Sequence, residues 1–373
     1  MQLHCYPLSI VLNHIEKYAV KKLDKKIKNR KDLIKQVYFP PINKNGAWSF
    51  QDYIGHDGIR YYSYARHALL DALKLCGIKK DDKVLIPGFI CREVLSPINT
   101  IGAIPVFYDV TSKLKIKLLN ELPKVKALIV VNYFGFPAEL SEMHEYCSIN
   151  EVFVIEDNSH GFLSKDNNNK LLGTRADIGL FSFRKSMPVI DGAALVVNNT
   201  KLLTKLNKQL DYDNVGGKYE FIKRTIKKII PVSSFSLIFS LIKLKQGIRH
   251  ILKGDSVSVS TVGSEYNLPG KPNPSLDLKT YIKAISIDKE IERRRALYAY
   301  LTEYLGDEVK VIFDLNSNIT PYVFPFRCDN INSIKKKLNK ISLDCYKWPE
   351  LPEEIKSSCP EYYRNVCMVP FLW

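Results

Sequence analysis

The chain has 373 residues, of which 46% are hydrophobic and 11% aromatic, and because this exceeds what one hydrophobic core usually holds, two domains are expected. The formal net charge is +16, and two segments carry nearly all of it: residues 17–35 have net +7 and residues 221–254 have net +8. The rest of the chain is nearly neutral and has no zinc-finger, KH or RRM signature, which argues against a nucleic-acid-binding protein.

Residues 1–60 are interpreted as a basic N-terminal arm. Val20, Leu23 and Ile27 recur among its lysines at roughly helical spacing, which indicates a basic amphipathic helix. Such a helix either has a binding function or packs on the domain by one stripe and leaves its lysines in solvent, and both interpretations stay open. No basic segment precedes the first apolar stretch, so we expect no secretory signal.

An alternation of helices and strands begins near residue 61. Residues 65–76 have apolar side chains at helical spacing and end before Gly77, so we expect a helix whose first turn faces solvent or a ligand. Residues 83–87, 104–108 and 128–131 are typical of buried strands, and residues 91–101 are expected to be helical. Strands separated in this way imply right-handed crossovers and a mainly parallel sheet.

The stretch from residue 152 to residue 198 is the most informative. Residues 152–155 form an apolar run too short for a helix, so we expect a buried strand that carries Glu156 and Asp157 at its carboxyl end. Open α/β sheets bind their ligands at that end. A second strand, residues 178–183, contains Ser182 and ends next to Lys185, and a third is expected at residues 193–197. An acid, a hydroxyl group and a lysine should therefore meet.

Lys185 and Asp157 have a chemical use as a pair. A lysine desolvated at the rim of a sheet loses part of its preference for the charged form, and a neutral amine is a nucleophile toward aldehydes. A nearby carboxylate can keep a heteroaromatic nitrogen protonated, which makes the ring an electron sink. Alternatively, Lys185 is one of many solvated lysines and Asp157 caps a strand. Spacing alone leaves both interpretations open.

The pattern changes after residue 199. Residues 229–242 are apolar but too few to span a membrane, so we expect them in a dimer interface or in the plane of a membrane. Residues 255–274 are rich in Ser, Gly and Pro and are the expected linker. Residues 276–305 are expected to form one long helix with Glu290, Glu292 and Arg293 to Arg295 on its polar face. Two strands, 309–313 and 322–326, and a helix, 331–340, complete a smaller domain.

The cysteines show no C-x-x-C pair and no spacing typical of metal ligands. We therefore expect reduced thiols in a cytoplasmic protein and no metal site. The eight positions are Cys5, Cys76, Cys91, Cys147, Cys328, Cys345, Cys359 and Cys367.

The stretch 152–198 resembles the cofactor site of the DegT/DnrJ/StrS-type sugar aminotransferases, which bind pyridoxal 5'-phosphate. Lys185 stands seven residues before Gly192, which is the family's interval between its cofactor-binding lysine and its first closing glycine. Asp157 matches the residue that pairs with the pyridine nitrogen, and Ser182 matches a serine that contacts the phosphate. His160 stands where the family usually has a glutamine near the phenolic oxygen of the cofactor.

The resemblance also implies roles near residues 65 and 91. Ala65 and Arg66 stand at the family's Gly-Thr pair, whose backbone amides hold the cofactor phosphate. Arg66 either adds a cation there or pairs with a neighbouring carboxylate. Cys91 occupies the place of the aromatic residue that stacks on the pyridine ring, and Phe89 is either its substitute or part of the core.

By this resemblance the protein has fold type I of the pyridoxal-phosphate transferases, an α/β fold. We expect a mainly parallel seven-stranded sheet sandwiched by helices, with a smaller C-terminal α/β domain. The expected division is an arm at residues 1–60, a large cofactor-binding domain at 61–254 with a basic and apolar insertion at 221–254, a linker at 255–274 and a small domain at 275–373.

The resemblance implies transfer of an amino group from an amino-acid donor to a nucleotide-linked keto-sugar, in cell-surface polysaccharide or amino-sugar biosynthesis. It also implies a cytoplasmic homodimer, and the two basic segments suggest contact with the inner face of a membrane. The alternative is a scaffold of a polysaccharide assembly system that keeps the fold without catalysis. Its support is that only two residues separate Ser182 from Lys185, where the family commonly has four, that Cys91 replaces an aromatic residue, and that Ala193 replaces a glycine.

Overall fold

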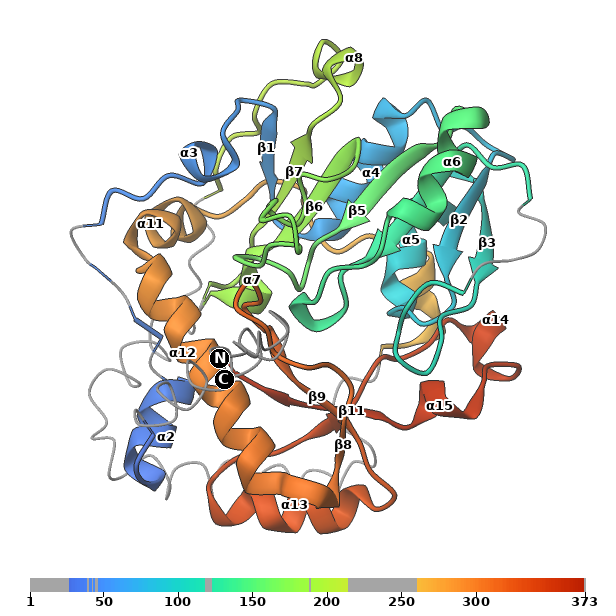
Figure 1. Cartoon of the computed structure of the whole chain (residues 1–373). Coiled ribbons are helices and arrows are strands. Elements are labelled where there is room, and N and C mark those ends of the chain that lie inside the picture. Colours follow the sequence, from blue (N-terminus) through green and yellow to red (C-terminus); the bar gives the residue numbers. More distant parts are fainter. Residues whose placement is uncertain are drawn as a thin grey trace, which may run out of the picture.

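The computed structural model describes residues 27–38, 40, 41, 43, 46–117, 123–187, 189–213 and 260–371 (Figure 1). The start of the expected basic helix, the apolar run at 229–242 and the basic residues around that run lie outside the described residues. In the described part of the chain, no helix is long and apolar enough to cross a membrane. The same part contains no group of three or more His, Cys, Asp or Glu residues that could hold a metal ion.

The larger sheet has seven strands in the order β1-β7-β6-β5-β4-β2-β3. Strands β2 to β6 pair in parallel, whereas β7 pairs antiparallel with both β6 and β1. The predicted α/β class with a mainly parallel seven-stranded sheet is therefore confirmed. The strands are β1 Ile59–Tyr62, β2 Lys83–Pro87, β3 Ile104–Tyr108, β4 Ala127–Val131, β5 Phe153–Asp157, β6 Ile178–Ser182 and β7 Ala193–Val197.

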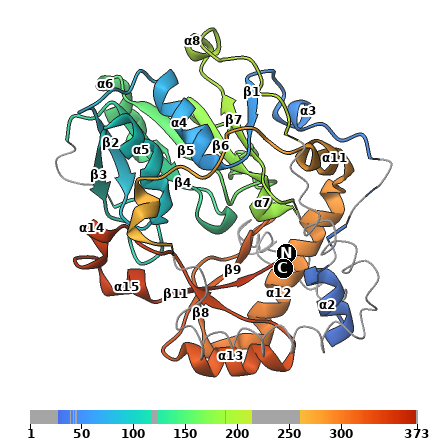
Figure 2. The same cartoon turned by 180° about the vertical axis from the view of Figure 1, so that it is seen from behind.

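Helices cover both faces of this sheet, as Figures 1 and 2 show from opposite sides. Helix α6 lies on one face, and α4 and α5 lie on the other, where α4 packs against β6, β7 and α5. Because both faces are covered, every side chain of the central strand β4 is buried. The helices around the sheet are α3 Phe50–Ile54, α4 Ala65–Leu75, η1 Arg92–Val94, α5 Leu95–Ile101, η2 Tyr133–Gly135, α6 Ser141–Ile149, α7 Phe183–Ser186 and α8 Thr200–Leu203.

The C-terminal part contains a four-stranded antiparallel sheet in the order β10-β11-β9-β8. Helix α12 packs against its strand β9 and against α2, whose Leu33, Ile34 and Val37 are buried. The predicted smaller domain is thus present as a sheet with helices. The remaining described elements are α2 Arg30–Tyr38, η3 Val262–Glu265, α11 Leu276–Ala284, α12 Ile287–Leu305, η4 Gly306–Glu308, β8 Lys310–Val311, β9 Val323–Arg327, α13 Ile331–Lys340, β10 Tyr346–Lys347, α14 Glu353–Lys356, α15 Glu361–Arg364 and β11 Val366–Pro370.

The single long helix expected at residues 276–305 is wrong, because Ile285 and Ser286 have non-helical backbone angles between α11 and α12. The polar face expected on it is wrong for four of its five residues, and only Glu292 is exposed. Glu290, Arg293, Arg294 and Arg295 are each at most 8% exposed. Glu290 accepts ion pairs of 2.6 Å from two of these arginines, so its burial is compensated. Carbonyl oxygens of neighbouring segments accept further hydrogen bonds from the guanidinium groups of Arg293, Arg294 and Arg295.

Strand β1 was not expected from the sequence. Its residues Ile59 to Tyr62 pair with β7 and so extend the large sheet into the segment that was interpreted as an arm. Only every second residue of this four-residue strand is buried, so the strand lacks a continuous apolar run that the sequence would reveal. The domain boundaries drawn from the sequence stay a prediction.

Candidate active site

A pocket of about 170 Å³ opens at the carboxyl ends of β5 and β6, beside the first turn of α4. Six of the eight residues singled out from the sequence line it: Ala65, Arg66, Cys91, Asp157, Ser182 and Lys185. A larger cavity of about 490 Å³ lies between α6 and the loop before β6, and none of these six lines it. The combination of an amine, an acid and two arginines therefore identifies the smaller pocket as the candidate active site.

Lys185 contacts His160 at the wall of this pocket. The Nζ atom of Lys185 lies 3.0 Å from Nε2 of His160. Burial lowers the pKa of Lys185, and the nearby Arg184 lowers it further, while the acidic groups of Cys91, Asp157 and Glu93 act in the opposite direction. Burial and the positive charge of Lys185 hold the pKa of His160 well below its ordinary value. Lys185 is therefore a free amine more readily than a lysine in solvent.

Helix α7 carries Lys185 and is held at both ends. The ring of Phe183 is fully buried and meets those of Phe50 and Phe162 edge-on. Its backbone N–H donates to the carbonyl oxygen of Gly192 at 2.9 Å. At the other end, Nη2 of Arg294 donates to the Ser186 carbonyl oxygen at 2.8 Å. The lysine backbone is thus fixed between two well-packed residues.

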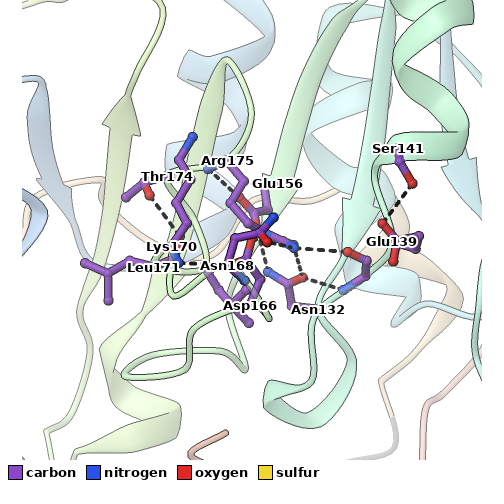
Figure 3. Close-up of polar contacts among 12 residues, drawn as sticks. Asn132, Glu139, Ser141, Glu156, Asp166, Asn168, Lys170, Leu171, Thr174 and Arg175 are labelled. Atoms are coloured by element: carbon purple, nitrogen blue, oxygen red, sulfur yellow. Dashed lines mark hydrogen bonds and ion pairs between the residues drawn. The ribbon is translucent and has the colours of Figure 1, made fainter. Parts of the chain in front are cut away.

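Asp157 and Glu156 are adjacent on β5 but serve different sides, because successive strand residues point to opposite faces. Asp157 lines the pocket and accepts a hydrogen bond from the Ser159 backbone N–H at 3.0 Å. Glu156 is fully buried and pairs with Arg175 at 2.6 Å (Figure 3). Asn132 donates to Glu156 and accepts from Arg175, each at 2.8 Å. This network fixes the end of β5 from behind the pocket.

Two arginines flank the first turn of α4. The guanidinium groups of Arg66 and Arg184 lie 6.0 and 5.3 Å from the ring centre of Tyr64, and all three residues line the pocket. Burial lowers the pKa of Arg66, whereas the carboxylate of Glu93 raises it. A helix N-terminus with two guanidinium groups is suited to an anion. The structure thus places Arg66 as a cation at the pocket, where the charge of Glu93 acts on it.

Cys91 and Phe89 differ in their surroundings. Cys91 lines the pocket, and burial raises the pKa of its thiol to about 12. Phe89 is fully buried among the rings of Tyr133, Trp348 and Tyr363, and it does not line the pocket. Of the two interpretations of Phe89, the structure favours the core residue.

Several residues of the site escaped the sequence analysis. Arg184 and Glu93 stand next to, or two positions from, residues that were singled out, so their charge was the available signal. Tyr322 and Trp348 reach His160 from the C-terminal part, with ring centres at 4.7 and 5.2 Å. No spacing in the sequence links them to it, because more than 160 residues intervene.

The comparisons with known proteins agree with this geometry. The model of the DegT/DnrJ/EryC1/StrS aminotransferase family matches residues 41–230, just over half of the chain. The GDP-perosamine synthase of Escherichia coli O157:H7 is 26% identical over 271 residues, which cover 67% of this chain and 70% of that protein. Four other curated relatives are matched over 30% to 43% of their own length.

Solved structures of low sequence identity share the fold. DesV of S. venezuelae, in complex with a ketimine intermediate, is 16% identical with a TM-score of 0.59, and the match covers 94% of this chain and 91% of that one. A GDP-4-keto-6-deoxymannose-3-dehydratase with a trapped PLP-glutamate geminal diamine is 17% identical with a TM-score of 0.56, covering 86% of both chains.

Proposed function

Because the chain belongs to the DegT/DnrJ/EryC1/StrS aminotransferase family, we propose that it transfers an amino group from an amino-acid donor to a nucleotide-linked keto-sugar. The family uses pyridoxal 5'-phosphate. A relative that is named as a GDP-perosamine synthase supports a sugar nucleotide as the acceptor. The observation that carries the proposal is that Lys185 and Asp157 line one pocket at the carboxyl ends of β5 and β6.

The groups in the pocket fit pyridoxal phosphate. Its aldehyde matches the Lys185 amine, and its basic ring nitrogen matches the carboxylate of Asp157. Its phosphate matches the first turn of α4, an eleven-residue helix that begins at Ala65 and whose first backbone N–H groups have no partner within the helix. Arg66 and Arg184 add two positive charges beside that turn.

Each residue would then have a distinct task. When bound, pyridoxal phosphate supplies an aldehyde that takes up the amino group and a ring that withdraws electrons. Lys185 would hold that aldehyde carbon through Nζ, with loss of water, and as a free amine would carry a proton at the same nitrogen. Asp157 keeps the ring nitrogen protonated. Arg66, Arg184 and the α4 amides hold the phosphate, with Ser182 beside them.

A scaffold without catalysis is the second candidate, because Cys91 replaces an aromatic residue and the segment from Ser182 to Lys185 is short. The short segment folds as the single turn α7, however, and Lys185 still lines the pocket. A lysine whose pKa is lowered by burial and which lines a cleft beside a carboxylate is also typical of a functional site. These observations support the enzyme.

Pyridoxal phosphate is expected to attach covalently to Lys185. The purified chain should gain a visible absorption band with the cofactor, and borohydride reduction should fix the label on the Lys185 peptide. Lys185→Ala should lose both signals, whereas Lys74→Ala, a change on the exposed side of α4, should retain them. A reducible adduct that persists in Lys185→Ala would contradict the assignment, and the complete absence of binding would favour the scaffold.

A further inference from the structure

His160 is a buried imidazole, 4% exposed, and both of its nitrogens have a partner. The backbone N–H of Phe134 points to Nδ1 at 3.3 Å, and Nζ of Lys185 lies 3.0 Å from Nε2. The imidazole ring also stacks with two aromatic rings, that of Tyr322 at 4.7 Å and that of Phe134 at 5.8 Å between centres. The ring can therefore neither rotate freely nor reach water.

These two contacts determine which nitrogen of His160 carries the proton. Nδ1 faces a backbone N–H, which can only donate, so Nδ1 must accept and has no hydrogen. In a neutral imidazole the proton is then on Nε2. Nε2–H is a donor, so the nitrogen 3.0 Å from it must accept. An ammonium group has no lone pair and cannot accept, whereas a neutral lysine amine can. The contact therefore requires Lys185 as the free amine.

The backbone around His160 is built to keep this arrangement. Phe134 has a φ of +58°, an unfavourable conformation for a residue with a side chain, and this turn directs its N–H toward the imidazole. Gly135 follows with a φ of +98°, and a Cβ atom there would lie 2.9 Å from the Thr320 carbonyl oxygen and 3.2 Å from that of His160. The Tyr322 backbone N–H donates to the Phe134 carbonyl oxygen at 2.8 Å.

The charges that face Lys185 mostly favour its protonated form. Asp157, Glu93 and the Cys91 thiol raise its pKa, and Arg184 lowers it. The groups stacked on His160 are the uncharged rings of Phe134 and Tyr322, and a protonated Lys185 would lower the pKa of the imidazole, so His160 is neutral in either state of Lys185. Two carboxylates near Lys185 favour its protonated form. Burial and a hydrogen bond donated to Nζ must therefore together stabilise the neutral amine.

We propose that His160 is a positioning residue that holds Lys185 as a free amine by donating its Nε2–H to Nζ. The hydrogen bond itself does not depend on the proposed function. Only its purpose rests on that function, since a free amine is the form that attacks an aldehyde and accepts a proton. The hydrogen bond also occupies the lone pair of Nζ until an aldehyde replaces the Nε2–H of His160 as its partner. The Lys185 amine is thus held in one orientation.

The test is the pH dependence of Lys185 modification in the cofactor-free full chain. Lys185 is acetylated with trace acetic anhydride over a range of pH, and mass spectrometry gives the extent of acetylation. The midpoint of this curve is the pH at which half of the Lys185 amine is neutral, and the exposed Lys74 on α4 serves as the reference. His160→Leu removes the donor, whereas His160→Gln can accept from the Phe134 N–H through Oε1 and donate through Nε2. We expect the Leu variant to lower the reactive fraction of Lys185 at pH 7.5 by about tenfold, equivalent to a midpoint about one pH unit higher. The Gln variant should stay within about twofold of the unmodified protein.

An unchanged Lys185 midpoint in His160→Leu, or a Gln variant that behaves like the Leu variant, would overturn the proposal. Should the Leu variant fail to fold by circular dichroism, ¹⁵N-histidine NMR of the unmodified protein decides instead. The resonance that disappears in His160→Gln should show a neutral ring protonated at Nε2 at pH 7, and an Nδ1–H tautomer or an imidazolium would contradict the proposal. Both readouts are independent of cofactor attachment, so failure of the proposed function remains distinguishable.

Discussion

At the residue scale, the adjacent carboxylates of Glu156 and Asp157 have different roles because successive residues of a strand point to opposite faces of the sheet. Glu156 is committed to Arg175 and Asn132 inside the protein, so it is not available to a ligand. Asp157 points the other way and lines the pocket with Lys185. A one-residue change of register in β5 would exchange these environments. The parallel register of β5 with β4, which pairs Val131 with Asp157, therefore fixes which acid faces the site.

Replacing Asp157 should separate cofactor attachment from turnover. In Asp157→Asn the amide cannot hold a positive ring nitrogen, so we expect the attachment to Lys185 to persist while kcat falls by roughly 10²-fold or more. Absorption spectroscopy and transamination assays with glutamate as donor measure the two properties. Asp81→Asn, an exposed change in the turn before β2, is the control. A variant that retains full kcat would exclude Asp157 from this role.

At the element scale, the loop between β5 and β6 is anchored by Arg175. Its guanidinium donates to Glu156 and Asn132 (Figure 3) and to the Ala138 carbonyl oxygen, so one side chain joins the loop to β5 and to the segment that follows β4. Both partners of the ion pair are nearly fully buried, with 8% and 0% of their side chains exposed. Such a pair is sensitive to the loss of one partner, because the other is then left as an uncompensated charge.

Arg175→Met should therefore destabilise the chain by about 3–5 kcal/mol, measured as the free energy of unfolding in urea. Removal of both charges, in Arg175→Met with Glu156→Met, should recover part of that loss. Lys337→Met removes a partner from the ion pair with Glu308, whose side chain is half exposed, and should cost at most about 1 kcal/mol. Equal losses in the buried and the exposed pair would refute this account of the loop.

At the scale of the whole molecule, the site depends on both sheets. The pocket lies at the large sheet, but Tyr322 and Trp348, which contact His160, precede β9 and follow β10 of the small sheet. Arg294 on α12 donates to the Ser186 carbonyl oxygen next to Lys185. The pair of Lys185 and His160 is therefore assembled from segments that span more than half of the chain.

We expect the chain to form a homodimer, as its family resemblance implies. The described surface exposes five large apolar side chains, those of Ile104, Ile149, Val262, Tyr266 and Leu276. Light scattering should give twice the chain mass at micromolar concentration, and a monomer with full activity would contradict the expectation. Contact with a membrane through residues 17–35 and 221–254 stays a prediction, since most of these residues lie outside the described part.

The sequence by itself determined the sheet class, the strand that carries Asp157 and the strand that precedes Lys185, because strands are local patterns of β-branched and apolar residues; the short helix α7, which carries Lys185, was not expected. The bounds of β2, β3 and β7 agree with the pattern, as do those of α13. The burial of Arg294 and its neighbours, the core position of Phe89 and the contact of His160 with Lys185 were decided by tertiary structure alone. Periodicity reports which side chains share a face, but whether a charged side chain finds carbonyl or carboxylate partners depends on segments distant in sequence. For the same reason, the proton on His160 follows from the Phe134 N–H, which only the folded chain places there.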